Sequence, residues 1–375
     1  MLRWLRSLSK TFMVSLNIFA VLGLFLSYLA TYISPEKFVF LAFFGVAYGV
    51  LLIINLFFVF FWLLVKKRLA LISVIALALG VNHLRHYFEF LPSLNGDPKG
   101  SHTVKIVSQN VRLFGWYNWE SNIEDRDWMM RNLELAEADI YCFQEFFHNT
   151  RPGTFETREL LKKTLSTEFL HEYYPVTVHG DQHYGIATFS KYPIVRKGKI
   201  EFSEERSNAC IYSDLVVGYD TIRVYNAHLA SIRFSEDDYK FLDELQNSKE
   251  DKPTPDLSEG MGILTRLGNA YIKRANQISQ ITNHIKASPY RVILCGDFND
   301  TPVSFTYGKV SKLLEDSFQN GGLGIGNTYR GTFPSFRIDY IFHSEELKSD
   351  NYFRLPEEIS DHHAIGTTIY WEKDP

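Results

Sequence analysis

The 375-residue chain has a formal net charge of −4, but its first ninety residues hold eight Lys/Arg and two Asp/Glu, while the remainder holds 31 and 41. This length accommodates one large domain and an additional segment, and the acidic remainder disfavours nucleic acid as a partner without excluding a local basic groove. The three cysteines, Cys142, Cys210 and Cys295, lack CxxC spacing, which argues against a disulfide framework or a zinc site and indicates buried free thiols.

Residues 1–91 are predicted to form a membrane region with three transmembrane helices. Residues 11–33 contain no charged residue, and these 23 positions suffice to cross a bilayer core. A cleaved signal peptide is the alternative, but the stretch is long for one, and a second uncharged stretch follows at residues 38–65. The third segment, residues 69–84, is shorter, and we interpret it as a span because Arg85 can extend toward the interface.

Positive residues predict the orientation of this region. They gather at Arg3, Arg6 and Lys10 and again at residues 66–68, so both places are expected to be cytoplasmic. Three spans then place the rest of the chain outside the cytoplasm, in a periplasmic or extracellular position. If residues 69–84 only dip into the membrane, the rest of the chain is cytoplasmic instead.

After a linker at residues 92–101, residues 102–375 are predicted to form one α/β domain. Five apolar runs typical of buried strands end in polar residues. These polar residues are Asn110, Glu145, Asn226 with His228, Asp297 with Asn299, and Asp361 with His362. An ordinary turn also contains Asp and Asn, but the recurrence of the pattern favours one site built from several strand ends.

Three further segments lie between or beside these strands. An aromatic group lies at Trp116, Tyr117, Trp119 and Trp128. It could line a substrate groove or lie against lipid headgroups, although core or surface packing is the commoner explanation. Residues 232–263 are predicted to be an inserted loop, either a substrate-selecting lid or decoration, and a helix follows at residues 264–285. The glycine-rich residues 320–326 lack the Lys-Ser/Thr of a phosphate loop, so we interpret them as a flexible loop.

The ordered motifs resemble the endonuclease/exonuclease/phosphatase superfamily over about residues 102–370. The motifs are Asn110, Gln144-Glu145, Asn226-Ala227-His228-Leu229, Gly296-Asp297-Phe298-Asn299, Ile338-Asp339-Tyr340 and Ser360-Asp361-His362. This superfamily includes pancreatic deoxyribonuclease, abasic-site endonucleases, neutral sphingomyelinases and inositol-polyphosphate 5-phosphatases. The resemblance implies a four-layered α/β sandwich of two packed mixed sheets flanked by helices, with a divalent metal at one edge.

The resemblance also implies a metal site. Glu145 would be the principal ligand of Mg²⁺, with Mn²⁺ as a substitute, and Asn110 and Asp361 would lie nearby. Oxygen ligands of this kind suit a hard divalent cation.

By the same resemblance, His362 would act as general base or electrostatically on the phosphate, with Asp339 fixing its tautomer. Asp297 would orient the attacking water. Hydrogen bonds to the phosphoryl oxygens would come from His228 and Asn299. The residues expected to bind substrate are Tyr184 and Asn226, with a packing role as the alternative for Tyr184.

The leading hypothesis is a membrane-tethered, divalent-metal-dependent phosphoester hydrolase that acts on lipid-linked or other extracytoplasmic phosphoesters. Its architecture resembles the teicoplanin-resistance membrane phosphatases, which suggests substrates of the undecaprenyl-pyrophosphate type by analogy only. The alternatives are a metal-dependent endonuclease or exonuclease and a catalytically silent membrane protein that binds lipid or a partner. The sequence leaves open the oligomeric state and the preference for monoesters or diesters.

Overall fold

The computed structural model describes residues 2–90, 101–116, 123–151, 153, 155–202, 207–232, 257–331 and 336–372. Most of the predicted linker, Tyr117, Trp119 and residues 233–256 of the predicted insertion lie outside the described residues. The chain divides into two compact units. Unit 1 comprises Met1–His83, Ala230–Asn276 and Val303–Gly308, and unit 2 comprises Leu84–Leu229, Gln277–Pro302 and Lys309–Pro375.

Unit 1 contains most of the N-terminal helices. They are α1 (Leu2–Ala30), α2 (Pro35–Phe38), α3 (Phe40–Val46), α4 (Tyr48–Val65), α5 (Lys67–Leu79) and the start of α6 (Val81–Arg85). Ser34 caps α2 by accepting from the amide of Glu36, and Pro35 occupies the first helical position, where its missing amide hydrogen costs nothing. The predicted second span, residues 38–65, is divided among the end of α2, α3 and α4. The predicted third span, residues 69–84, is divided at Gly80 between α5 and α6.

A buried polar cluster joins α1, α4 and α5. Asn17 donates to the Ser73 hydroxyl at 2.6 Å and accepts from the Trp62 indole at 2.9 Å. Ser73 in turn donates to Asn55 Oδ1 at 3.1 Å, and the Asn55 amide donates to two backbone carbonyls. All four side chains are buried. Because an unpaired polar group in an apolar interior is costly, these bonds fix how the three helices pack.

The contacts along α1 give the direction of its neighbours. Asn17 bonds Trp62, whereas Tyr28, farther along α1, packs its ring 6.2 Å from that of Tyr48. Helix α4 therefore runs antiparallel to α1. Asn17 bonds Ser73 of α5, whereas the Tyr28 ring lies 4.8 Å from that of His83, ten residues later in the chain. The segment from α5 to α6 therefore runs parallel to α1.

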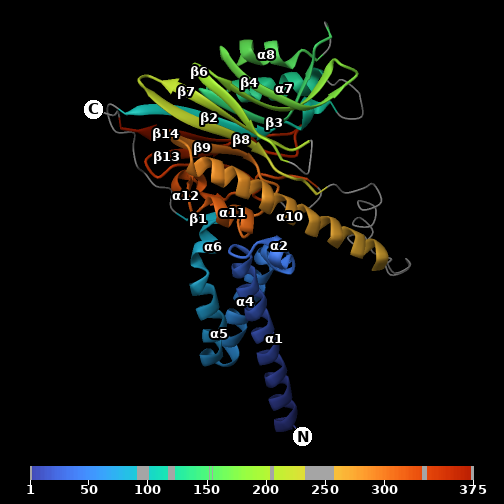
Figure 1. The fold of residues 1–375 in the computed structure, drawn as a ribbon. Coiled ribbons are helices and arrows are strands. Elements are labelled where there is room, and N and C mark those ends of the chain that lie inside the picture. The colour runs from blue at the N-terminus through green and yellow to red at the C-terminus, as the bar shows by residue number, and fades with distance from the viewer. Residues whose placement is uncertain are drawn as a thin grey trace. The chain divides into compact units, whose positions relative to one another are not determined.

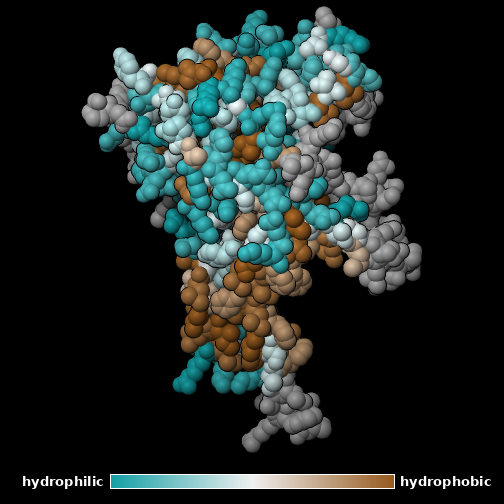
Figure 2. All heavy atoms as spheres, viewed as in Figure 1, coloured by the Kyte–Doolittle hydropathy of each residue, from teal (hydrophilic) through white to brown (hydrophobic). Residues whose placement is uncertain are grey.

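Two of the described helical stretches are long and apolar enough to cross a membrane, Lys10–Ala30 and Tyr48–Val65. Many of their large apolar side chains point outward, and Phe19 and Ile53 are 70% and 66% exposed. Figure 2 shows the hydrophobic side chains, in brown, gathered over the N-terminal helices. Water-exposed apolar surface of this extent is costly, so these helices suggest association with a membrane.

Unit 2 is an α/β sandwich of two six-stranded mixed sheets flanked by helices, as predicted (Figure 1). The first sheet has the order β13 (Lys348–Arg354), β14 (Ile365–Trp371), β2 (His102–Asn110), β3 (Ile140–Asn149), β5 (Gln182–Ser190) and β4 (Phe169–Val178). The second has the order β10 (Glu315–Asp316), β12 (Asp339–His343), β9 (Arg291–Asp297), β8 (Asp220–His228), β7 (Ala209–Val217) and β6 (Ile194–Ile200). The pairs β2–β3 and β8–β9 are parallel.

The remaining described elements are short except for three helices. They are η1 (Arg112–Gly115), α7 (Ile123–Glu134), α8 (Thr157–Thr164), α10 (Leu257–Lys286), α11 (Phe305–Val310), α12 (Ser317–Gly321), and a two-stranded sheet of β1 (Phe88–Glu89) and β11 (Gly324–Ile325). Helix α10 starts before the predicted helix and contributes residues to both units, so the predicted second domain supplies part of unit 1.

Alternation along the central strands creates two hydrophobic cores. On β2, Val104 and Ile106 belong to a core that also includes residues of β8, β9 and β12. Val107 points the other way, into a core shared with α7 and α8. The three cysteines are free and buried, as predicted. Tight packing on both faces of this sheet holds its strand ends in place.

Candidate active site

The register of the second sheet brings three polar residues side by side. Asp297 ends β9 and pairs with His228 at the end of the parallel strand β8. Strand β12 runs antiparallel to β9, so its first residue, Asp339, also pairs with Asp297. The motifs of three separate segments therefore meet at one edge of the sheet, where the sequence pattern predicted a site.

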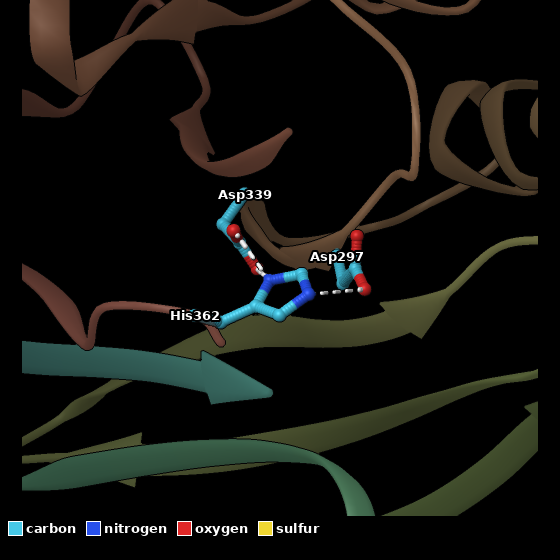
Figure 3. Close-up of side chains that lie close together, drawn as sticks. All are labelled: Asp297, Asp339 and His362. Atoms are coloured by element: carbon cyan, nitrogen blue, oxygen red, sulfur yellow. Dashed lines mark hydrogen bonds and ion pairs between the residues drawn. The ribbon is translucent and has the colours of Figure 1, made fainter. Parts of the chain in front are cut away.

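His362 completes this group from the loop before β14. Its Nδ1 atom lies 2.9 and 3.1 Å from the two carboxylate oxygens of Asp339, and its Nε2 atom lies 3.8 Å from Asp297 Oδ2 (Figure 3). All three side chains are buried. The pairing with Asp339 fixes the orientation of the ring.

The charges of His362, Asp297 and Asp339 shift the pKa values of His362 and Asp297. Burial lowers the pKa of His362, but the Asp339 and Asp297 carboxylates outweigh this effect and raise the pKa to about 10. Burial raises the pKa of Asp297, and Asp339 adds to the rise, whereas His362 and His228 oppose it. In this arrangement His362 is a cation near neutral pH, and its Nε2 atom is a hydrogen-bond donor.

Asp297 is held by two amide side chains. Asn110 Nδ2 donates to Asp297 Oδ2 at 3.0 Å and to Glu145 Oε1 at 3.1 Å. The backbone amide of Asn299 donates to Asp297 Oδ1 at 2.8 Å, and its Nδ2 atom donates to Asp297 Oδ2 and to the carbonyl of Leu229. The side chain of Asn299 thus positions Asp297, and its predicted hydrogen bond to a phosphoryl oxygen stays a prediction.

His228 faces both carboxylates at longer range. Its Nε2 atom lies 3.7 Å from Asp297 Oδ2 and 3.9 Å from Glu145 Oε1. This buried nitrogen has no hydrogen-bond partner among the described residues. A buried donor without a partner is costly, so the geometry suits an incoming oxygen atom, and the predicted contact of His228 with phosphate stays a prediction.

Three residues at these strand ends have left-handed or glycine-specific backbone. Glu145 has φ 48° at a bulge of β3, and Asn299 has φ 52°. Gly296 has φ 149°, and a Cβ atom there would collide with the carbonyl of Ala227. Such conformations cost free energy and persist where the surrounding structure holds them, commonly at functional sites.

The donor set fits a divalent cation. Glu145 and Asp297 direct one carboxylate oxygen each at the same Asn110 amide and the same His228 nitrogen. Two carboxylates drawn this close repel each other, and a cation relieves that repulsion. Asp297, Asp339 and His362 also lie close enough together to hold an ion, but His362 Nδ1 already bonds Asp339. Carboxylate oxygens therefore fit the ion better than this imidazole does.

The predicted metal ligands are only partly brought together. Asn110 contacts Glu145, but its Oδ1 atom accepts from the backbone amide of Arg112. Asn110 therefore orients the two carboxylates through its nitrogen. Asp361 is partly exposed, and its carboxylate lies 3.8 Å from Arg112 Nε. The direct contacts described here join Glu145 to Asn110 and Asp361 to Arg112.

Asn226, predicted to bind substrate, is engaged inside the protein, and its substrate role stays a prediction. Its side chain is fully buried, its Oδ1 atom accepts from Gln144 at 2.7 Å, and its Nδ2 atom donates to Ala187 O at 2.9 Å. Although Asn226 and His228 point to the same face of β8, Asn226 pairs with Cys295 inside the sheet rather than with Asp297 at its edge. Asn226 thus joins the two sheets behind the site.

Tyr184 belongs to an aromatic group near the end of β3. Its hydroxyl donates to Gln182 Oε1 at 3.3 Å, and its ring lies 4.9 Å from that of Phe147. Trp116 stacks on Phe147 at 5.0 Å, and Trp128 is partly buried against the same core. These contacts favour packing for the described part of the predicted aromatic group, and substrate binding by Tyr184 stays a prediction.

Sequence reasoning missed the residues that hold the loop of Asp361 and His362. The carboxylate of Glu357 accepts from the backbone amides of Ile359 and Ser360 and from the Gln109 side chain at 2.6 Å. Ser360 donates to the carbonyl of Asn110 at 2.8 Å. An acidic residue three positions before Ser360 is the only local signal of this cap, and Gln109 offers none.

Thr328 was also missed. Its hydroxyl oxygen accepts from the backbone amides of Ile338 and Asp339, both at 3.1 Å. The next residue, Tyr329, pairs its backbone with His362 and places its ring 5.3 Å from the imidazole. A single short segment thus supports both members of the Asp339–His362 pair.

Comparison with known proteins adds a family match. A model of the Endonuclease/Exonuclease/phosphatase family matches residues 107–362. A second family, described as a domain of unknown function (DUF8431), matches residues 9–87. No curated protein matches the chain.

The chain is also similar to solved structures at low identity. An endonuclease/exonuclease/phosphatase from Beutenbergia cavernae is 13% identical, with a TM-score of 0.51 and coverage of 73% of each chain. A family protein from Leptotrichia buccalis is 18% identical, with a TM-score of 0.49 and coverage of 71% of this chain and 99% of that one. Sphingomyelinase C from Streptomyces griseocarneus is 17% identical, with a TM-score of 0.44 and coverage of 71% and 99%.

Proposed function

The chain belongs to the endonuclease/exonuclease/phosphatase family, and from this membership we propose that it is a membrane-tethered, divalent-metal-dependent phosphoester hydrolase. The observation that carries the proposal is the group of buried Asp297, Asp339 and His362 with the largely buried His228, at one end of the strands of the second sheet. Its carboxylates suit a metal and a water, and its imidazoles suit phosphoryl oxygens.

Phosphoester hydrolysis requires an activated water and stabilisation of charge on the phosphoryl oxygens. Asp297 is the group best placed to accept the proton of the water, because burial raises its pKa and Asn110 and Asn299 hold it. His362 carries its proton at neutral pH, which favours the electrostatic role over that of general base. Its Nε2 atom, together with that of His228, donates to the phosphoryl oxygens.

Glu145 is proposed as the principal ligand of the cation, with Asp297 beside it and Asp361 at the rim. The bound ion, Mg²⁺ or Mn²⁺, would supply Lewis-acid stabilisation of the phosphoryl charge. Asn110 keeps both carboxylates turned inward. Arg112, at the rim, balances the negative charge of Asp361.

The membrane tether rests on unit 1. Helices α1 and α4 have the required length and composition, and α5 packs with them through the buried Asn17–Ser73 bond. The like-charged Lys10, Lys66 and Arg68 lie near one another at one end of this bundle. Positive residues favour the cytoplasmic side. Since the α5–α6 segment runs parallel to α1, we propose that the chain leaves the membrane on the opposite side, where phosphoesters of membrane lipids are accessible.

A topology measurement tests this orientation. We expect a reporter that is active only outside the cytoplasm to be active when fused after Pro375, and one that is active only inside to be inactive. An active inside reporter would contradict three spans. Cytoplasmic phosphoesters and nucleic acid would then again be candidate substrates. The same fusion placed after Lys66 is the control, because it should report the cytoplasmic side.

A metal titration separates an enzyme from a silent scaffold. We expect the full-length protein in detergent to bind Mn²⁺ at a specific site, and Glu145→Gln to weaken binding by at least about tenfold, because a carboxylate ligand becomes neutral. Glu172→Gln is the matched control, since Glu172 of β4 pairs with Arg158 of α8 and does not contact the Asp297 group. Specific binding that is unchanged in Glu145→Gln would contradict the assignment of Glu145, and no specific binding would favour the scaffold.

A further inference from the structure

The glycine-rich residues 320–326 are packed on one side only. A Cβ atom at Gly322 would collide with the ring of Phe318, and one at Gly326 would lie 2.8 Å from Phe318 and Arg337. These glycines allow the backbone to lie against α12 and the start of β12. The two apolar side chains of the run, Leu323 and Ile325, point outward and are 69% and 61% exposed.

The same run pairs with the segment that follows α6. Phe88 lies opposite Ile325 and Glu89 opposite Gly324, and the amide of Gly326 donates to the carbonyl of Tyr87. Glu89 is buried and bonds Arg85 at 3.3 Å. This small sheet therefore has an anchored inner side and an apolar outer side.

Four residues form what we call the β1–β11 patch: Phe88, Phe90, Leu323 and Ile325. The rings of Phe88 and Phe90 lie 4.6 Å apart, and Phe90 is 59% exposed. Phe88 is partly buried, whereas Phe90, Leu323 and Ile325 remain exposed. Apolar side chains that share one surface and remain exposed mark a site of interaction rather than a core.

Chain connectivity limits where this patch can lie. Phe88 follows the end of α6 at Arg85 by three residues, and three residues span about 10 Å at most. A segment that leaves a bilayer through α5 and α6 therefore places β1 at the level of the headgroups, where aromatic side chains are enriched.

We propose that the β1–β11 patch inserts into the headgroup layer of the bilayer that holds the N-terminal helices. This inference rests on the proposed membrane tether and extends it to a second, non-helical contact. It commits to lipid as the occupant, because the patch is continuous in the chain with the membrane segment and its outward side chains are apolar.

The patch is also continuous with the active site. Gly326 is followed after one residue by Thr328, whose hydroxyl bonds the amide of Asp339, and then by Tyr329, which packs on His362. A patch held at the headgroups thus fixes the segment that supports the catalytic pair next to the lipid surface. The substrate class that fits this placement is a phosphoester of a lipid headgroup.

Site-directed fluorescence tests the contact in the full-length protein. The three native cysteines are buried, so Leu323→Cys and Ile325→Cys can each be labelled selectively with an environment-sensitive thiol probe. The labelled proteins are reconstituted in vesicles of phosphatidylcholine and phosphatidylglycerol that carry a spin label on the acyl chain near the headgroup. We expect the spin-labelled lipid to lower the fluorescence of both probes by at least about twofold.

Two control sites make the result decisive. Tyr219→Cys, at a fully exposed turn between β7 and β8, should be insensitive to the lipid label and sensitive to aqueous iodide. Phe57→Cys, an outward residue of α4, should be quenched by lipid. If Phe57 is quenched while both patch positions behave like Tyr219, the patch inference is overturned and the tether stands. If Phe57 is also insensitive to lipid, the tether itself fails and the patch inference fails with it.

Discussion

Replacing His362 by glutamine is expected to lower phosphoester turnover by roughly 10² to 10⁴-fold in a protein that remains folded. The imidazolium beside Asp297 is lost, and the neutral amide cannot supply the same charge to the phosphoryl oxygens. Glutamine retains a donor toward Asp339, so that buried carboxylate keeps a hydrogen bond. Steady-state rates with a chromogenic phosphodiester measure the effect, and the thermal unfolding midpoint checks the fold.

His363→Gln is the matched control for this change. The neighbouring ring lies outside the Asp297 group and has its Nδ1 atom 3.2 Å from the carbonyl of Leu355. We expect its rate to stay within about threefold of wild type, because a residue that does not contact the reacting groups affects turnover only indirectly. A His362→Gln protein that keeps most of its activity would show that the imidazole has been assigned the wrong role.

The largest expected effect on stability comes from Arg337. Its guanidinium bonds both oxygens of Asp316 at 2.5 and 3.1 Å, both side chains are buried, and the rings of Phe318 and Tyr340 lie 4.7 Å from it. Arg337→Met keeps much of the volume but leaves the Asp316 carboxylate without its partner. We expect the free energy of unfolding to fall by about 3–5 kcal/mol, measured by denaturant titration in detergent.

Two further variants separate charge from packing at this position. Adding Asp316→Asn to Arg337→Met removes the stranded charge and keeps an acceptor for the amide of Phe318, so we expect it to recover a substantial part of the loss. Arg151→Met breaks the pair of an exposed guanidinium with the partly buried Asp181 and should cost below about 1 kcal/mol. A loss for Arg337→Met no larger than that for Arg151→Met would contradict a structural role for the buried pair.

Much of the site could be predicted because its residues stand at strand ends. Asp297 follows four apolar residues and a glycine, a pattern that indicates a buried strand and its exit. The pairing of Asp297 with both His228 and Asp339 depends on sheet register between distant segments, and the sequence expresses it only through the family resemblance. The buried position of Asn226 was not predictable, because alternation shows which face of a strand a residue occupies but not how far it lies from the strand end. Two residues along β8 separate Asn226, which pairs with Cys295, from His228, which pairs with Asp297.

Other features were not predictable because they depend on tertiary contacts. Helix α10 begins at Leu257, among Ser, Glu and Gly residues that lack apolar periodicity. The third apolar segment breaks at Gly80, where the Tyr28 side chain occupies the space that a Cβ atom would need. Thr328 acts through hydrogen bonds to backbone amides of a distant segment, which no local residue pattern indicates, and Glu357 gives only the weak signal of an acidic residue three positions before Ser360.

Hydrolysis of a phosphoester by the full-length wild-type protein tests the central claim most directly. The protein is treated with a chelator, reconstituted in vesicles, and supplied with a phospholipid phosphodiester and then with Mg²⁺ or Mn²⁺. The account predicts no turnover after chelation, recovery when the cation is restored, and no recovery in Asp297→Asn, which keeps the shape of the side chain without its charge. Turnover that is indifferent to chelation, or the absence of turnover of any phosphoester with either cation, would contradict it.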